Sequence, residues 1–178
     1  MTKIAVLVGS LSQASINKKL ARNLEELAPE GTEFIYADLH LPLFDYELEV
    51  DFPKEAQALK GVIEQADGVL FVTPEYNRGY SGVLKNAIDW ASRPHGSNSF
   101  NGKPAGIVGA SGGSLGTTQA QQALRNVAVY LNTKLMGQPE LYIDGPRTFD
   151  ETGKVVEASR DVLSKYIATL VNHIESSK

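Results

Sequence analysis

Three polar segments hold most of the residues that could bind a ligand, and each directly follows an apolar run. The first is VGSLSQASIN, in which the hydroxyls of Ser10, Ser12 and Ser15 and the amide of Asn17 can each donate a hydrogen bond. A helical pattern follows, and a helix N-terminus offers unpaired N–H groups and a dipole that favours an anion. Because one hydrogen bond to a charged group contributes about 1.5–3 kcal/mol, several together predict a phosphate site. The alternative is that Ser15 or Asn17 only caps the helix.

Two known phosphate-binding motifs do not fit this first segment. The P-loop requires G-x-x-x-x-G-K-[ST], and no second glycine or lysine occurs here at that spacing. The dinucleotide fingerprint requires G-x-G-x-x-G, of which only Gly9 is present. Asp38 lies near the end of the second predicted strand, where a ribose-binding acid would lie, but without the glycines we interpret it as a surface acid. The segment therefore suits a terminal monophosphate better than a pyrophosphate.

The second polar segment, TPEYNRGYSG, combines an aromatic ring with hydrogen-bonding groups. Pro74 ends the preceding strand, and Tyr76 provides a flat aromatic face. Glu75, Tyr76 and Asn77 provide backbone and side-chain groups for the edge of a polar heterocycle. The alternative is a surface turn that ends in an N-cap at Ser81.

The third polar segment, GASGGSLGTT, is rich in glycine, which permits close approach of the backbone to a ligand. It also matches the G-x-S-x-G nucleophile elbow, with Ser111 as the nucleophile and Asp144 or Asp150 and then His173 following in hydrolase order. The elbow requires a helix directly after the serine, but GGSLG intervenes. His173 also lies in a helix patterned for the surface. A serine hydrolase is therefore the weaker interpretation.

Composition and charge exclude several other classes. The chain has 178 residues, no cysteine, a net charge of −4 and a hydrophobic content of 42%. A mildly acidic chain without a polybasic cluster is a poor candidate for binding nucleic acid or an anionic membrane. His40, His95 and His173 are far apart in sequence, so we expect no metal site. The opening residues favour a first strand over a signal peptide, and no run is long enough to span a bilayer, so we expect a cytoplasmic protein.

Apolar runs and helical patterns alternate along the whole chain. This alternation predicts one doubly wound α/β domain over residues 1–178, with a flavodoxin-like parallel sheet of strand order 2-1-3-4-5. Pro139 indicates a break or an edge position in the last strand, Pro53 fits the first turn of the second helix, and Ser159 is a plausible N-cap of the last. Strands are expected at 3–8, 32–39, 68–74, 103–111 and 134–143, and helices at 18–28, 53–66, 82–92, 117–131 and 160–174.

The predicted topology brings the three polar segments together. In open α/β sheets, ligands bind beyond the carboxyl ends of the strands, where the strand order reverses. The segments follow strands one, three and four, so all three should meet at that switch point. The helix at 82–92 is apolar on more than one face because of Val83, Leu84, Ile88 and Trp90. This pattern is typical of a core helix or of a helix that also contacts a partner subunit.

Motifs in all three segments resemble the NADPH-dependent FMN reductase family. Residues 9–17 are similar to the family pattern G-S-x-R-x-x-S-x-N. The family's PEYN turn and the following LKNAIDW helix are present at 74–77 and 84–90. The glycine-rich third segment and QQALRNVAVYLN resemble the next turn and helix. The resemblance covers nearly the whole chain and implies a flavodoxin-like flavoprotein related to quinone, azo-dye and chromate reductases.

The resemblance implies a function and a cofactor site. The function is hydride transfer from NADPH or NADH to bound FMN and on to a small-molecule acceptor: a quinone, a flavin, an azo compound or a metal oxyanion. Hydride transfer needs stacking and orientation, so no catalytic acid or base is expected, and Tyr76 should contact the stacked substrate. A homodimer or homotetramer is expected, and a flavodoxin-type electron carrier is the alternative. The implied FMN contacts are Ser10, Ser12, Ser15, Ile16 and Asn17 at the phosphate, Pro74, Glu75, Tyr76, Asn77 and Arg78 along the flavin and ribityl chain, and Ser111, Gly112 and Gly113 on the other side of the ring.

Two positions depart from the family pattern. Ser12 occupies the place of a usual arginine, which removes a fixed positive charge beside the phosphate. We therefore expect weaker FMN binding, or a contribution from Lys18 and Lys19. Ser81 occupies the place of a common proline, from which we expect a more mobile loop.

Overall fold

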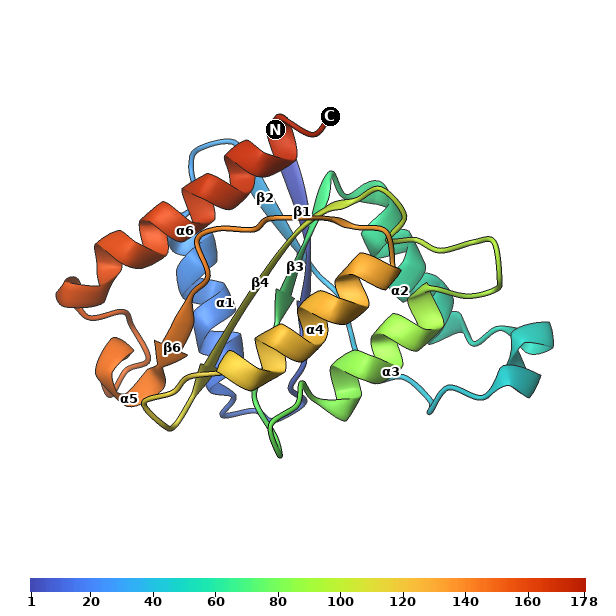
Figure 1. The fold of residues 1–178 in the computed structure, drawn as a ribbon, viewed down its shortest axis with the longest axis horizontal. Helices are drawn as coiled ribbons and strands as arrows, with labels where there is room; N and C mark the ends of the chain where they lie inside the picture. Colours follow the sequence, from blue (N-terminus) through green and yellow to red (C-terminus); the bar gives the residue numbers. More distant parts are fainter.

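A parallel sheet with helices on both faces forms the centre of the computed structural model, which describes all of residues 1–178 (Figure 1). The strand order is β2-β1-β3-β4-β5, and a sixth strand, β6, pairs with β4. This confirms the predicted flavodoxin-like class. The strands are β1 Thr2–Val8, β2 Thr32–Tyr36, β3 Gly68–Val72, β4 Pro104–Ser111, β5 Lys134–Leu135 and β6 Tyr142–Asp144.

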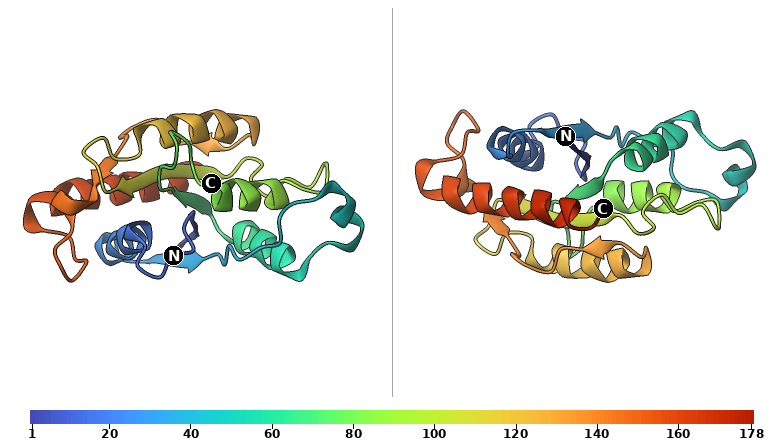
Figure 2. Two further views of the ribbon diagram at one scale, coloured as in Figure 1. Left: turned by 90° about the horizontal axis from the view of Figure 1, so that it is seen from below. Right: turned by 90° about the horizontal axis from the view of Figure 1, so that it is seen from above.

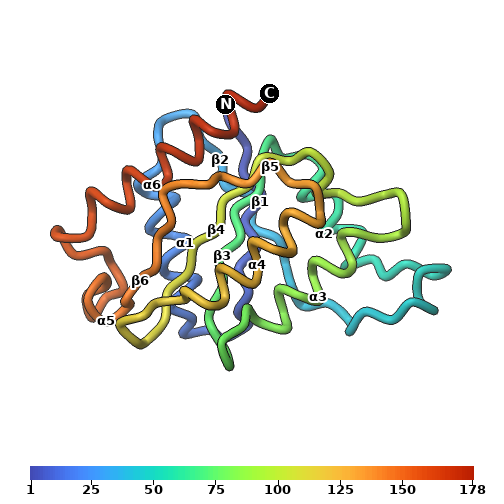
Figure 3. The backbone as a smooth tube through the Cα atoms, in the orientation of Figure 1, coloured from blue at the N-terminus to red at the C-terminus, as the bar shows by residue number.

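The register of the sheet places the polar segments beside one another. Val8 pairs with Val72, and Val72 pairs with Val108, so the carboxyl ends of β1, β3 and β4 lie together at one end of the sheet. The three polar segments begin just beyond these residues. The two chain termini lie side by side at the opposite end of the sheet (Figure 3), where the Thr2 hydroxyl donates to Glu175 Oε1 over 2.8 Å.

Two hydrophobic clusters cover the two faces of the sheet. Side chains alternate between faces along β1, so that Ile4 and Val6 enter one cluster while Ala5 and Leu7 enter the other. Figure 2 shows α1 and α6 on one side of the sheet and α2 and α3 on the other. No helix is long and apolar enough to cross a bilayer. The main helices are α1 Ile16–Leu27, α2 Lys54–Gln65, α3 Gly82–Ala91, α4 Thr118–Tyr130 and α6 Glu157–Glu175.

Trp90 on α3 belongs to the core. Its ring is fully buried and packs edge-on against Phe44 and Phe52, at centroid distances of 4.9 and 5.1 Å. Its indole N–H donates to the Pro42 carbonyl over 2.8 Å. All three partners belong to residues 40–53, which protrude beside α3 (Figure 1). The second apolar face of α3 is therefore covered by the chain itself at this residue.

Residues 40–53 also contain an element that the sequence analysis did not predict. A 3-10 helix, η1 Tyr46–Asp51, forms in the expected loop. Asp45 caps it, because its Oδ1 accepts a hydrogen bond of 3.0 Å from the Glu47 N–H.

Other boundaries differ from the sequence predictions. The last predicted strand is two short strands, β5 and β6, with Pro139 in the break that this proline indicated. The Ser159 N-cap is wrong: α6 begins at Glu157, and the Ser159 N–H already bonds to the Val156 carbonyl. Pro53 is the N-cap residue of α2 and precedes its first turn. A short extra helix, α5 Gly145–Thr148, follows β6.

The break between β5 and β6 leaves the middle of β4 without a strand partner on that edge. β4 pairs with β5 at Pro104 and Ala105 and with β6 from Gly109 onward. Tyr166 of α6 is fully buried, and its hydroxyl donates to the Ile107 carbonyl over 2.8 Å. A side chain therefore satisfies an acceptor that a neighbouring strand would otherwise take.

Candidate functional site

The three polar segments surround a cavity of about 390 Å³ at the carboxyl edge of the sheet. A second hollow of about 350 Å³ adjoins it and shares Glu75 and Ser111. All thirteen site residues predicted from the sequence line one of the two. The first cavity is lined by Ser10, Ser12, Ala14, Ser15, Ile16, Asn17, Pro74, Glu75, Tyr76, Ala110, Ser111 and Gly112. The second adds Asn77, Arg78, Gly113, Ser114, Leu115 and Gly116.

Neutral hydrogen-bond donors gather at the N-terminus of α1. Ser15 caps the helix, because its Oγ accepts a bond of 3.3 Å from the Lys18 N–H. The Ser15 hydroxyl hydrogen stays free to donate, so capping and ligand binding are compatible. The main-chain N–H groups of Ile16 and Asn17 have no partner within the chain. Together with the Ser12 hydroxyl, these groups form a cradle for an anion.

The Asn17 side chain already makes two hydrogen bonds within the chain. Its Nδ2 donates to the Ala110 carbonyl and its Oδ1 accepts from the Ala110 N–H, both over 2.9 Å. The residue is buried. One N–H of the amide is therefore used within the chain, and donation of the second N–H to a phosphate stays a prediction. Asn17 links the first polar segment to the third.

Ser81, which replaces a common proline of the family pattern, caps α3. Its Oγ accepts a bond of 3.2 Å from the Leu84 N–H, and the residue is buried. The same oxygen lies against Gly9, where an added Cβ would come within 2.5 Å of it. Gly9 therefore allows the first polar segment to pass directly over the start of α3.

Tyr76 is held at the rim of the cavity by a two-residue turn. Tyr76 and Gly79 exchange two backbone hydrogen bonds of 2.9 Å. Between them, Asn77 and Arg78 have φ angles of +52° and +63°, as a type I′ turn requires. Asparagine adopts this region readily but arginine does not, and such strained residues gather at functional sites. Tyr76 is 58% exposed, so its ring is accessible to a ligand.

Glu75 connects the second polar segment to α4. Its Oε2 accepts hydrogen bonds from the Gln119 N–H over 2.9 Å and from the Ala120 N–H over 3.0 Å. Glu75 is also the only charged residue that lines the first cavity. One oxygen of the carboxylate is thus bonded to the helix, and Oε1 has no hydrogen-bond partner within the chain.

The structure excludes the serine-hydrolase interpretation. Ser111 donates to the Gly113 carbonyl, and α4 begins only at Thr118, so no nucleophile elbow forms. His173 Nε2 lies 2.6 Å from the Lys134 carbonyl at the start of β5, which is the opposite end of the sheet from Ser111.

Comparison with known proteins identifies the family. The family model described as NADPH-dependent FMN reductase matches residues 2–147. The chain belongs to this family. It is 49% identical to a 2-hydroxy-1,4-benzoquinone reductase of Burkholderia sp, over 96% of this chain and 92% of that protein. It is 39% identical to a quinone reductase of Pseudomonas putida, over 98% and 96% of the two chains.

A solved structure of similar sequence also superposes closely. FerB, a flavoenzyme NAD(P)H:(acceptor) oxidoreductase from Paracoccus denitrificans, is 40% identical with a TM-score of 0.94, and the match covers 99% of both chains. This member of the FMN reductase family therefore has a flavoenzyme fold along its whole length.

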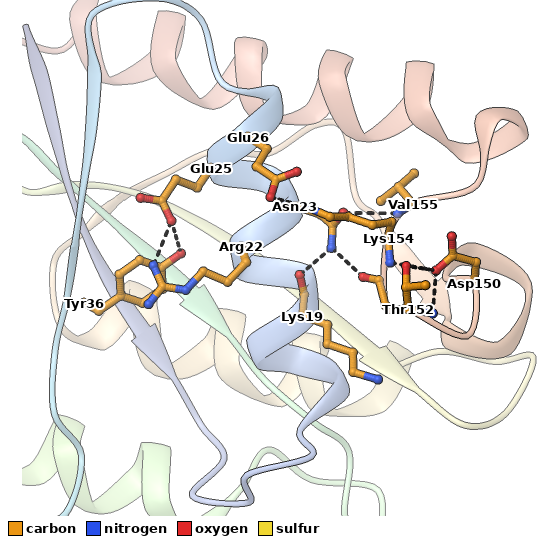
Figure 4. A network of polar contacts seen from close by, with 11 residues as sticks. Lys19, Arg22, Asn23, Glu25, Glu26, Tyr36, Asp150, Thr152, Lys154 and Val155 are labelled. Atoms are coloured by element: carbon orange, nitrogen blue, oxygen red, sulfur yellow. Dashed lines mark hydrogen bonds and ion pairs between the residues drawn. The ribbon is translucent and has the colours of Figure 1, made fainter.

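A third cavity, of about 310 Å³, flanks the N-terminal part of α1 in this family member on the β2 side. Arg22 stacks over the Tyr36 ring at 3.9 Å, and both side chains bond to Glu25 (Figure 4). The pKa of Tyr36 is raised mainly by burial of its hydroxyl and, to a smaller extent, by the hydrogen bond to Glu25. Hydrogen bonds from His40 lower the pKa of Asp38, which is an exposed acid as the sequence suggested.

Lys18 and Lys19 lie outside the first cavity of this FMN reductase relative. Lys18 Nζ lies 3.3 Å from the Leu11 carbonyl, and Lys19 lies farther along α1 beside the turn at 150–154 (Figure 4). Both face a separate hollow of about 280 Å³. Neither lysine lines the first cavity, so the cradle itself contains no cationic side chain.

The sequence analysis missed some residues that line the two site cavities. Leu115 is 80% exposed at the rim of the second hollow. Leu115 could have been recognised from the sequence, because it is an apolar residue within a run of glycine, serine and threonine. Ala14, Ala110, Ser114 and Gly116 contribute mainly backbone and carry no comparable signal in the sequence.

Proposed function

We propose that this protein is an FMN-dependent NAD(P)H oxidoreductase that reduces quinones. The observation that carries the proposal is the meeting of the three polar segments around one cavity, with an anion cradle at the α1 N-terminus. The printed names of the similar proteins, two quinone reductases and an NAD(P)H:(acceptor) oxidoreductase, support the same activity.

The residues present fit FMN. The cradle supplies hydroxyl and main-chain donors for a phosphate, and the first cavity as a whole contains no carboxylate other than Glu75, which α4 already binds. A Cβ at Gly112 would meet no atom within 4 Å, so the backbone there borders open space suited to a flat ring. Each of the two adjoining hollows has a volume typical of small-molecule sites, about 300–1,000 Å³.

The chemistry requires positioning from the protein more than acid–base groups. When bound, FMN supplies the ring that accepts and donates the hydride. Ser12, Ser15 and the α1 N-terminus hold the phosphate, and the turn at Tyr76 and the backbone at Gly112 border the ring. Tyr76 and Leu115 offer apolar surface at the rim to a nicotinamide or a quinone. These groups orient the reactants and limit the access of water.

A spectroscopic experiment tests this function. The purified protein, incubated with FMN and desalted, should be yellow, and NADPH or NADH added without oxygen should bleach it rapidly. A benzoquinone should then restore the colour with turnover. A yellow protein that neither nucleotide reduces would instead support an electron carrier. A protein that takes up no FMN would contradict the proposal.

We also propose one FMN-binding domain over residues 1–178, a cytoplasmic location and a homodimer or homotetramer. The exposed Val129 and Tyr130 on α4 offer apolar surface for a second copy. Light scattering of wild type and of Val129→Asp/Tyr130→Asp tests the assembly: the charged variant should shift to the monomer mass. An unchanged oligomer would place the interface elsewhere.

Ser12→Arg should tighten FMN binding about tenfold. The new guanidinium would add a charge-assisted hydrogen bond to the phosphate, and about 1.5 kcal/mol corresponds to that factor. Fluorescence titration of the apoprotein with FMN measures the dissociation constant. Gln13→Arg is the control, because Gln13 is adjacent in sequence but does not line the first cavity. Unchanged or weaker binding, or an equal gain from Gln13→Arg, would contradict the role of Ser12.

Tyr76→Ser should raise the KM for a quinone about three- to tenfold, while FMN stays bound. The ring supplies aromatic surface worth about 0.5–1.5 kcal/mol beyond its area. Tyr76→Phe keeps that surface and should behave as wild type. Steady-state kinetics with a benzoquinone distinguish the variants, and equal KM values for serine and phenylalanine would rule out a stacking role.

A further inference from the structure

Glu75 is a carboxylate in a place where the proposed ligand itself is anionic. It is the only charged residue lining the first cavity and the only acidic residue lining the second. A phosphate and a flavin need no negative charge there. Binding of a phosphate and a flavin therefore does not explain why residue 75 is an acid.

The geometry explains part of the role. Thr117 is the N-cap residue of α4 but makes no capping bond, and its Oγ1 instead accepts from Gln121 Nε2 over 2.9 Å. Glu75 supplies the missing cap from a segment 44 residues earlier, with bonds to the N–H groups of Gln119 and Ala120. Charge-assisted bonds at a helix N-terminus are stronger than neutral ones. They fix the turn that carries Tyr76 against the helix that follows the glycine-rich segment.

We infer that Glu75 is a positioning residue with two effects. It fixes the distance between the Tyr76 turn and the glycine-rich segment, between which the flavin ring would lie, and it lowers the reduction potential of bound FMN. This inference rests on the proposed function. The second effect follows from charge. A hydride brings two electrons and one proton to the ring, so the reduced ring carries one more negative charge until a second proton arrives. The Glu75 carboxylate opposes that charge, and it occupies the α4 N–H groups that would otherwise favour it.

Two variants separate the two effects. Glu75→Gln removes the charge while its amide oxygen can still accept from Gln119 and Ala120, so the turn should stay in place. The midpoint potential of FMN bound to Glu75→Gln should rise by about 30 mV. For a two-electron couple, this corresponds to a gain of about tenfold in the affinity for reduced FMN relative to oxidised FMN. Glu75→Ala removes the link as well and should weaken binding of oxidised FMN about tenfold.

A matched control is available at the other helix cap made by an acid. Asp45→Asn removes the charge of a capping carboxylate on η1, far from the cavity, and should change neither the potential nor the FMN dissociation constant. Potentials come from anaerobic titration against a reference dye, and dissociation constants come from fluorescence titration. Circular dichroism verifies that each variant is folded.

The outcomes are distinct. A midpoint potential of Glu75→Gln equal to that of wild type would overturn the electrostatic role, whether or not Glu75→Ala folds. Wild-type affinity of a folded Glu75→Ala for FMN would overturn the positioning role. Failure of the wild-type protein to bind FMN at all would instead overturn the proposed function.

Discussion

Asn17→Ala should lower the free energy of unfolding of the apoprotein by about 2–4 kcal/mol and weaken FMN binding at least tenfold. The truncation leaves the N–H and the carbonyl of buried Ala110 without partners, and each unsatisfied group costs about 1–3 kcal/mol. It also frees the first polar segment from the third, so the phosphate cradle and the ring border lose their fixed separation. Urea denaturation and fluorescence titration measure the two effects.

A second asparagine on the same helix provides a control for Asn17. Asn23 is also buried, and its amide bonds to the Lys19 and Gly153 carbonyls and to the Val155 N–H (Figure 4). It does not line the first cavity. Asn23→Ala should destabilise the protein by a similar amount and leave the FMN dissociation constant unchanged. If both variants weaken FMN binding equally, the effect of Asn17 is general loss of stability, and its specific role is contradicted.

Trp90→Ala should have the largest effect on stability, about 3–5 kcal/mol, because it removes a fully buried aromatic ring. The ring also joins α3 to Phe44, Phe52 and the Pro42 carbonyl. Loss of these contacts should release residues 40–53, so limited proteolysis under native conditions should cut there first.

Trp90→Phe separates packing from hydrogen bonding. It keeps most of the aromatic contact but loses the N–H that reaches Pro42, so we expect a smaller loss of stability than with alanine. Wild-type resistance of residues 40–53 to protease in the alanine variant would show that Trp90 does not hold this segment.

The alternation of apolar runs and polar segments predicted the strand order of the sheet and the location of the site, because both depend on short stretches of sequence. The apolar runs of β1, β3 and β4 and the switch-point rule placed the three polar segments around one cavity. The division of the last strand was less accessible, since β5 and β6 contain only two and three residues and carry little periodicity. Likewise, Arg78 gives no indication of a type I′ turn, which usually has glycine after the asparagine.

Long-range partners account for what the sequence could not predict at the site. Asn17 bonds to Ala110, 93 residues away, and Glu75 bonds to α4, 44 residues away. Both residues line the first cavity as expected, but a polar residue in a binding segment carries no local sign that a distant part of the chain also binds its side chain. The ambiguity of Trp90 had the same origin: its partners Phe44 and Phe52 lie in a segment without regular periodicity.

The interrupted edge of β4 has a consequence for the behaviour of the protein at high concentration. An open strand edge is a template on which a strand of another molecule can add, and this is a common start of aggregation. Here Tyr166 occupies the Ile107 carbonyl, and the segment between β5 and β6 is held to α4 by a bond of 2.8 Å from Gln121 Nε2 to the Leu141 carbonyl. The bare stretch of β4 therefore offers no continuous ladder to a second chain, although no full-length strand covers it.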